Sequence, residues 1–214
     1  MVTQDMPRRR GRPPAADSAE TKAKIFECAR QLFGERGYGS VTNKDLAAEA
    51  GLTTGALYHY VDSKAELYAQ VYGDVRARYY ARFDDAIAGS EGFVGQLEAV
   101  FDAAVALNRE DPSIAKFISA LRFDVRRHEE VRRLVADALA ERERYFFAIV
   151  EGAVETGEIA DGDQALAWEF IRLLLVGITE GAANPIEEQA LAIEAIKAML
   201  DGRLIKAVPE AGKL

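Results

Sequence analysis

Side chains that can bind a phosphate group or the edge of a base are concentrated between residues 42 and 64. They are hydroxyls, phenols, an imidazole and two ammonium groups: Thr42, Lys44, Thr53, Thr54, Tyr58, His59, Tyr60 and Lys64. Contacts to phosphates fix the position of a protein on a duplex, and contacts to base edges read its sequence. The segment therefore indicates nucleic-acid binding, provided that its elements present these side chains on one surface.

The same segment has the pattern of two short helices joined by a tight turn. Thr42 is a candidate N-cap of the first helix, with Asp45 in its first turn. Gly51 permits the turn because glycine adopts positive φ without steric cost, and either Thr53 or Thr54 caps the second helix. The residues expected to face inward are Leu46, Ala50, Leu57 and Val61. This is the pattern of a helix-turn-helix, whose second helix enters the major groove of DNA.

The pattern continues to Leu67 and resembles the TetR family of one-component transcriptional regulators. The matching residues are Thr42, Leu46-Ala47, Ala50-Gly51-Leu52-Thr53, Gly55, Leu57-Tyr58, Ser63-Lys64 and Leu67. The chain departs from the family pattern at Ala56, Tyr60 and Val61, where the family has a hydroxyl residue, histidine and phenylalanine. The resemblance covers roughly residues 18–70.

The resemblance and the chemistry of the side chains together imply roles in DNA binding. Phosphate contacts are expected from Thr42, Tyr58, Tyr60 and Lys64. Base-edge contacts are expected from Thr53 and Thr54, with His59 facing the groove, and Lys44 can serve either purpose. Gly55 lets the backbone approach closely. Tyr58 is expected on the outward face, and the alternative is a half-buried ring of which only the hydroxyl reaches DNA. A nearby phosphate would also explain Lys64 in the first turn of a helix, where a cation opposes the dipole.

An arginine-rich tail precedes this segment. Arg8, Arg9, Arg10 and Arg12 surround Gly11, and Arg-Gly-Arg-Pro resembles the core of an AT-hook, which lies in the minor groove of A·T-rich DNA. The alternative is a solvated basic tail that adds only non-specific attraction to phosphate. Because Pro7, Pro13 and Pro14 disfavour a helix, residues 1–17 are expected to be a disordered arm without DNA.

The composition is that of a soluble globular protein whose charge is unevenly distributed. The 214 residues are 49% hydrophobic and 29% charged, with a net charge of −8. Residues 1–64 hold 10 lysines and arginines against 8 acidic residues, whereas the remainder holds 17 against 27. Phosphate would repel the acidic remainder, so the charge favours a protein that touches DNA with its N-terminal end only.

The sequence gives little reason to expect catalysis, a metal or a cofactor. Its two histidines, His59 in the motif and His128 at a surface corner, form no plausible triad, and no glycine-rich phosphate loop follows a strand. Cys28 has no partner for an intramolecular disulfide, and no Cys/His cluster has metal spacing. No apolar run is long enough to span a bilayer and the N-terminus has no apolar signal core, so a cytoplasmic location is expected.

Helical periodicity predicts an all-α fold of about nine helices. We expect a DNA-binding domain at 18–64, a ligand-binding and dimerisation domain at 65–204 and a short tail at 205–214. The first helix is expected to run from Ser18, its cap, to Arg36. The helices near residues 163–180 and 186–200 are apolar on most faces, which favours burial against a second copy in a four-helix bundle over a monomeric arrangement.

The larger domain is similar to the inducer-binding module of the family only in its layout. Candidates to line a pocket for an apolar or aromatic inducer are Phe101, Phe117, Leu121, Phe146, Phe147 and Trp168, although for each residue taken singly plain core is the favoured interpretation. The function implied is a repressor that binds a pseudo-palindromic operator as a homodimer and is released by its ligand. The alternatives are an activator of the same fold, and a helical carrier or interaction protein without sequence-specific DNA binding.

Overall fold

The computed structural model describes residues 14–182 and 184–205, and these form helices and turns only. The elements are α1 (Pro14–Arg36), the 3-10 turn η1 (Tyr38–Ser40), α2 (Asn43–Glu49), α3 (Thr54–Leu57), α4 (Lys64–Ala88), α5 (Gly92–Glu110), α6 (Pro112–Arg127), α7 (Glu129–Glu155), α8 (Gln164–Gly181) and α9 (Ile186–Leu200). The predicted all-α fold is therefore confirmed over the described residues. None of the helices in this part of the chain is both long enough and apolar enough to cross a membrane.

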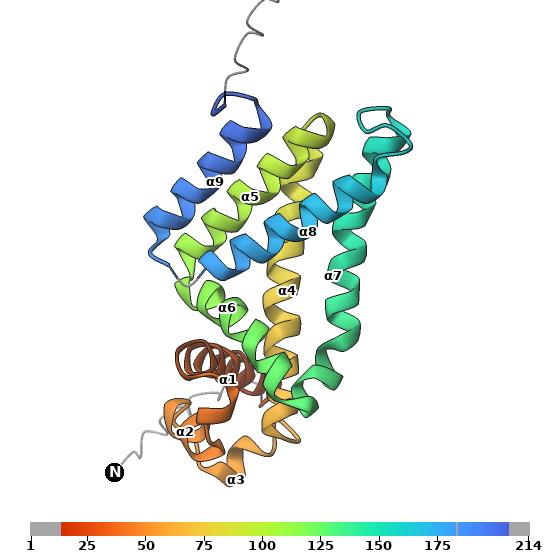
Figure 1. Cartoon of the computed structure of the whole chain (residues 1–214). Helices are drawn as coiled ribbons and strands as arrows, with labels where there is room; N and C mark the ends of the chain where they lie inside the picture. The colour runs from red at the N-terminus through yellow and green to blue at the C-terminus, as the bar shows by residue number, and fades with distance from the viewer. Residues whose placement is uncertain (1–13, 183, 206–214) are drawn as a thin grey trace, which may run out of the picture.

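The helices form an elongated molecule with a small N-terminal unit at one end of a bundle (Figure 1). The unit consists of α1, η1, α2 and α3, and α4 leaves it to run the length of the bundle. With 25 residues, α4 is about 37 Å long. In the bundle α5 and α7 pack on α4, α8 crosses obliquely over α4 and packs on α7, and α9 lies along α5.

The first helix begins at Pro14, four residues before the expected cap at Ser18. The prediction that Pro14 disfavours a helix was wrong, because proline is well suited to the first position of a helix. Its missing N–H is not needed there, and its fixed φ already fits the helix. The prediction of a disordered arm at residues 1–17 therefore does not hold for residues 14–17. Arg8, Arg9, Arg10 and Arg12 lie outside the described residues.

Two hydrophobic cores share α4. The first core holds buried residues of the N-terminal unit together with the first half of α4, much of α6 and the start of α7, and Phe33, Tyr68 and Phe117 lie at its centre. The second core lies between the second half of α4, α5, α7, α8 and α9, and includes Phe83, Phe101 and Phe146. Tyr79 packs against both cores, so α4 joins the two ends of the molecule.

The first helix is held on α6 by close packing and by a buried arginine. A Cβ atom on Gly34 would stand 2.9 Å from the backbone nitrogen of Phe117, so the two helices cross at a distance that only glycine permits. One helical turn away, Arg30 is 6% exposed and donates from Nη2 to Asp111 Oδ2 at 2.6 Å and from Nε to Ser113 Oγ at 2.7 Å. The N-terminal unit is therefore attached to the bundle through α6 as well as through α4.

Candidate nucleic-acid interface

The first helix of the predicted helix-turn-helix starts with a capping box. The hydroxyl of Thr42 accepts the backbone N–H of Asp45 at 3.2 Å, and the Asp45 carboxylate accepts the backbone N–H of Thr42 at 2.9 Å. The same carboxylate accepts the Thr42 hydroxyl at 2.6 Å. These bonds from Thr42 lower the pKa of Asp45. Thr42 therefore fixes the start of α2, as its predicted role as N-cap requires.

The turn after α2 depends on Gly51. Its φ is +72°, and the backbone N–H groups of Gly51 and Leu52 donate to the carbonyl oxygens of Ala48 at 3.1 Å and Ala47 at 2.7 Å. This crossed pair of bonds is a Schellman motif, in which the residue with positive φ ends the helix. The motif sets the direction in which the chain enters α3.

The second helix is one turn long and divides its residues between core and solvent. Thr53 caps it, since its hydroxyl accepts the backbone N–H of Ala56 at 3.1 Å. Leu57 is 1% exposed and Val61 is 4% exposed, as predicted for the inward face. Solvent-exposed residues on the other side are Thr53, Thr54, Gly55, Tyr58 and His59. The structure therefore brings together the residues that the sequence assigns to the groove-facing surface.

Tyr58 and Asn43 join the two helices at this surface. Tyr58 is 46% exposed, and its hydroxyl oxygen accepts a hydrogen bond from Asn43 Nδ2 at 2.5 Å. The phenol keeps its own hydrogen, which is available to a phosphate. The sequence did not single out Asn43, although its position directly after the cap Thr42 places it at the same helix end. Lys44, the next residue, is exposed.

Lys64 forms hydrogen bonds within the protein in addition to any bond to an external partner. Its Nζ donates to the carbonyl oxygens of Tyr38 and Val41, both at 2.8 Å, and lies 4.0 Å from the centre of the Tyr38 ring. Partial burial lowers its pKa. These bonds explain a lysine in the first turn of α4 without a phosphate, whereas the sequence reasoning used only the phosphate. An ammonium group has three N–H donors, so these two bonds leave one N–H without a carbonyl partner. Tyr60 nearby is half-buried against the first core.

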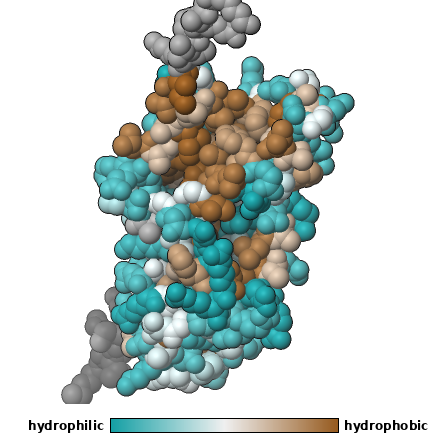
Figure 2. Space-filling view, in the orientation of Figure 1, coloured by the Kyte–Doolittle hydropathy of each residue, from teal (hydrophilic) through white to brown (hydrophobic). Residues whose placement is uncertain are grey.

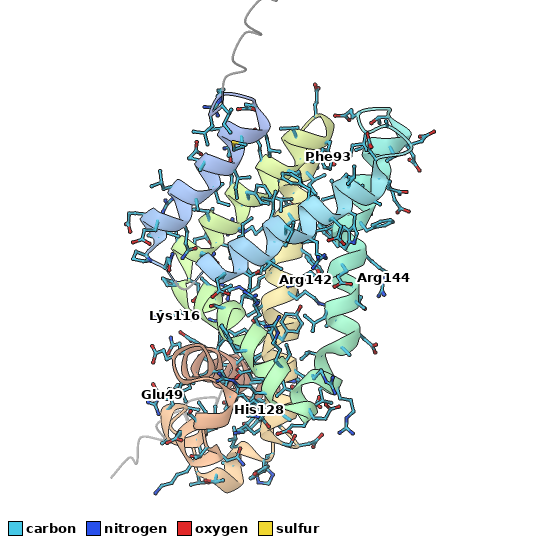
Figure 3. The ribbon with its side chains drawn as sticks, in the orientation of Figure 1. Glu49, Phe93, Lys116, His128, Arg142 and Arg144 are labelled. Carbon is cyan, nitrogen blue, oxygen red and sulfur yellow. The ribbon has the colours of Figure 1, made fainter. Side chains whose placement is uncertain are left out.

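A buried carboxylate connects this unit to the bundle. Asp124 of α6 is 5% exposed, and its Oδ2 accepts both the backbone N–H of Tyr38 and the hydroxyl of Tyr68, each at 3.0 Å. Burial, followed by the charge of Asp124, raises the pKa of Tyr68 strongly. His128, predicted on the surface, is half-buried with its ring centre 4.9 Å from that of Tyr38 (Figure 3). Movement of α6 would therefore move η1, which leads into α2.

Among the cavities between the described helices of the bundle, two lie against α6 and α7. The first cavity, of about 100 Å³, is lined by α4, α5, α6, α7 and α8 and has a mainly aromatic and aliphatic wall that includes Tyr79, Tyr80 and Phe83. The second cavity, of about 250 Å³, lies between α6, α7 and α8. The two share Ile118, Arg142, Leu175 and Thr179 in their walls.

The predicted ligand residues separate into two groups. Phe101 and Phe146 line the first cavity, and Leu121 lines the second. Phe117 lines neither, since it is fully buried in the first core with its ring centre 4.9 Å from that of Tyr68. Phe147 and Trp168 also lie outside both cavities and pack edge-to-face on each other, with ring centres 5.5 Å apart.

The sequence reasoning missed Arg142. It stands three residues after Leu139 and four before Phe146, which is the spacing of core-facing positions on α7. A basic residue on an apolar helix face was the signal that could have found it.

The outer faces of α8 and α9 are apolar. Exposed residues include Leu166, Phe170, Leu173, Val176, Leu191 and Met199. In Figure 2 a continuous hydrophobic surface covers the end of the molecule formed by α8 and α9, while the N-terminal unit is hydrophilic. Leu173 is 61% exposed and Leu191 is 70% exposed, so this chain alone does not bury the face.

Comparisons by sequence and by fold both find bacterial transcriptional regulators. Residues 25–71 match the family described as bacterial regulatory proteins, tetR family. The repressor KstR2 of Rhodococcus jostii is 27% identical over 175 residues, which cover 75% of this chain and 80% of KstR2. The regulator UidR of Escherichia coli K12 is 24% identical over 194 residues, covering 88% and 95%. A crystal structure of a transcriptional regulator from Pseudomonas aeruginosa PAO1 superposes with a TM-score of 0.68 at 25% identity, covering 86% and 91%.

Proposed function

The chain belongs to the TetR family of bacterial regulatory proteins, and we propose that it is a repressor that binds a pseudo-palindromic operator as a homodimer and is released by a small molecule. The observation that carries the proposal is the division of α3 into two faces. Leu57 and Val61 are buried in the first core, while Thr54, Gly55 and His59 are exposed beside them. Such a helix is anchored from behind and presents its outer face to a groove.

The contacts to DNA are proposed from the free donors of this face. Tyr58 contributes its phenol hydrogen and Lys64 its third N–H to phosphates, and Thr42 and Tyr60 lie beside them. Thr53, Thr54 and His59 face base edges, and Lys44 serves a phosphate or a base. The arginines at 8, 9, 10 and 12 are proposed to continue into the adjacent minor groove.

The dimer is proposed to form through the exposed apolar faces of α8 and α9. Leu166, Phe170, Leu173 and Val176 follow one another at intervals of three or four residues and so lie along one side of α8. Apolar patches of this extent on a soluble protein mark an interface. Two copies related by a twofold axis would make a four-helix bundle and would present two α3 helices about 34–36 Å apart or a multiple of this.

The effect of ligand binding is proposed to reach the DNA-binding unit through α4 and α6, because each of these helices extends from a cavity to the N-terminal unit. On α6, Ile118 lines both cavities and Asp124 holds Tyr38 and Tyr68. On α4, Tyr80 lines the first cavity and Lys64 holds the carbonyl oxygens around η1. A ligand that binds better to a different tilt of these helices would shift the population away from the DNA-binding spacing.

The proposal is tested by selection of bound sequences from a pool of random DNA duplexes at near-physiological salt. An enriched inverted repeat is expected, with flanking A·T enrichment that disappears when residues 8–12 are deleted. A matched variant, Thr54→Ala with His59→Ala, is expected to retain duplex but lose the motif. Weak, salt-sensitive retention without any motif would mean phosphate attraction alone and would contradict sequence-specific repression.

A further inference from the structure

Arg142 lies where the first and second cavities meet. It projects from α7 towards the space between α7 and α4, whereas Arg144, two residues later, lies on the outer side of α7 (Figure 3). Arg142 lines both the first and the second cavity. Its Nε is buried and donates to no acceptor among the described residues, and no carboxylate in this part of the chain forms an ion pair with it.

The hydroxyl of Tyr80 is a second buried polar group without a partner among the described residues, and it lines the first cavity. The Tyr80 ring is stacked on Tyr145, with ring centres 4.7 Å apart and planes 5° apart. Tyr145 in turn donates from its hydroxyl to Asp84 Oδ1 at 2.9 Å. Burial raises the pKa of Tyr80 to about 12, so its hydroxyl is a neutral donor at neutral pH. Its position is thus fixed by packing, and its hydrogen is free.

Leaving such donors without a partner is unfavourable. A buried polar atom without a hydrogen bond destabilises the folded state, and does so more strongly when the group is charged. The neighbouring Arg76 shows the usual solution, since it forms an ion pair with Glu141 at the surface. Arg142 has no equivalent, and groups of this kind are found where a protein binds a ligand of opposite charge.

Further positively charged side chains line the second cavity. Its wall includes Arg122, Arg126 and Arg172 in addition to Arg142, against one lining carboxylate, Glu143. Arg122 pairs with Glu180 and Arg172 with Glu169, both of them exposed. The first cavity by contrast is mainly aromatic and aliphatic. The two cavities therefore differ in chemistry, and Arg142 is where they meet.

We propose that the ligand of this protein is an amphipathic anion, with an apolar or aromatic body in the first cavity and an acidic group held by Arg142 and Tyr80 at the entrance to the second. This proposal rests on the ligand-binding part of the proposed function and specifies the class of ligand. The acidic group is a carboxylate, or a phosphate carried on a longer head that extends along the arginines of the second cavity. A neutral apolar molecule would leave both donors unpaired.

The test compares two fluorescent probes that share an aromatic body and differ in one charge. 8-Anilinonaphthalene-1-sulfonate carries a sulfonate, and N-phenyl-1-naphthylamine lacks it. Arg142→Gln is expected to weaken binding of the sulfonate by about tenfold or more and to leave binding of the neutral probe unchanged, because only the first forms a charge-assisted hydrogen bond. Tyr80→Phe is expected to weaken the sulfonate by a smaller factor. Arg144→Gln, on the outer side of the same helix, is the matched control and is expected to change neither.

Equal weakening of both probes by Arg142→Gln, or of neither, would overturn the proposal. If Arg142→Gln fails to fold, as judged by its helical circular dichroism, Arg142→Lys replaces it and is expected to give an intermediate affinity for the sulfonate. Displacement of the sulfonate by octanoate identifies the acidic group as a carboxylate, and displacement only by octanoyl-coenzyme A identifies a phosphate-bearing head. Failure of both to displace it would also contradict the proposal.

These measurements are made without DNA, so they are independent of repression. Loss of operator selection with the expected probe pattern would refute the proposed function and leave the ligand class standing. If an operator is selected but binding of the probes does not depend on Arg142, the proposed function stands and the ligand class is refuted.

Discussion

Asp124 offers the sharpest test of how the DNA-binding unit is attached to the bundle. Its Oδ2 alone accepts two buried donors, the backbone N–H of Tyr38 and the hydroxyl of Tyr68. Asp124→Ala removes the acceptor from both. Asp124→Asn keeps one oxygen that can take the place of Oδ2, but the two hydrogen bonds lose their charge.

The size of the effect follows from the number of donors left unpaired. Each buried donor without a partner costs about 1–3 kcal/mol, so Asp124→Ala is expected to lower the free energy of unfolding by about 2–6 kcal/mol. That is a large part of the roughly 5–15 kcal/mol that holds a typical protein folded. Asp124→Asn is expected to cost about half as much, because charge-assisted hydrogen bonds are roughly twice as strong as neutral ones.

The assay is urea unfolding followed by circular dichroism at one fixed protein concentration, in a cycle with Tyr68→Phe. Alone, Tyr68→Phe is expected to cost about 1 kcal/mol, since it deletes one hydrogen bond and leaves Asp124 with the other. In the Asp124→Ala background it is expected to cost nothing or to stabilise, because it then removes a donor that has no acceptor. The reasoning is refuted if Tyr68→Phe costs the same in both backgrounds, or if Asp124→Ala costs less than Asp124→Asn.

Three further outcomes can be measured on the same protein. Tyr58→Phe is expected to weaken operator binding by about two- to tenfold in fluorescence anisotropy. The thermal unfolding midpoint should stay unchanged, because the substitution removes an exposed hydroxyl that bonds only Asn43. A shifted midpoint would assign the hydroxyl a structural role instead. Burial and a hydrogen bond to Glu130 raise the pKa of Tyr38 from 10.0 to about 12, so the unfolded chain loses this proton at lower pH than the folded one. The urea midpoint of unfolding should therefore fall as pH rises from about 10 to about 12. Tyr38→Phe should flatten this decline, and an unchanged slope would contradict the assignment. Leu173→Glu places a charge on the exposed face of α8 and is expected to give a monomer by light scattering with much weaker operator binding, whereas a dimer of unchanged affinity would remove that face from the interface.

The helix-turn-helix could be predicted residue by residue because its determinants are local. Thr42 caps a helix through Asp45, three residues away, and Gly51 ends it through the backbone of Ala47 and Ala48. Both interactions lie within one or two turns of chain, so residue types and spacing are sufficient. Most helix bounds in the bundle follow similarly from glycines, prolines and caps such as Asp111, whose side chain accepts the backbone N–H of Ser113.

Some predictions for the site were wrong and some contacts were not predicted, because these depend on residues far apart in the chain. Phe101 and Phe117 have the same apolar spacing, but one lines a cavity and the other is enclosed by α1 and α4, which helical periodicity does not distinguish. The ammonium group of Lys64 turns inward because the carbonyl oxygens of Tyr38, in η1, and of Val41, just after it, lie within reach more than 20 residues earlier in the chain. Pro14 is the exception, since its error was local: proline was treated as a helix breaker at a position where it is favoured.

The division of labour within α3 has a consequence for how such proteins diverge. The fold of this turn depends on Thr53, Leu57 and Val61, whereas the side chains of Thr54 and His59 are exposed and form no hydrogen bond among the described residues. Under the proposed role of α3, substitutions at 54 and 59 would therefore change which bases are preferred at little cost to the folded state. Duplicated genes could acquire new operators through these two positions without first accumulating spare stability, and a library randomised at both would be a practical route to regulators with altered targets.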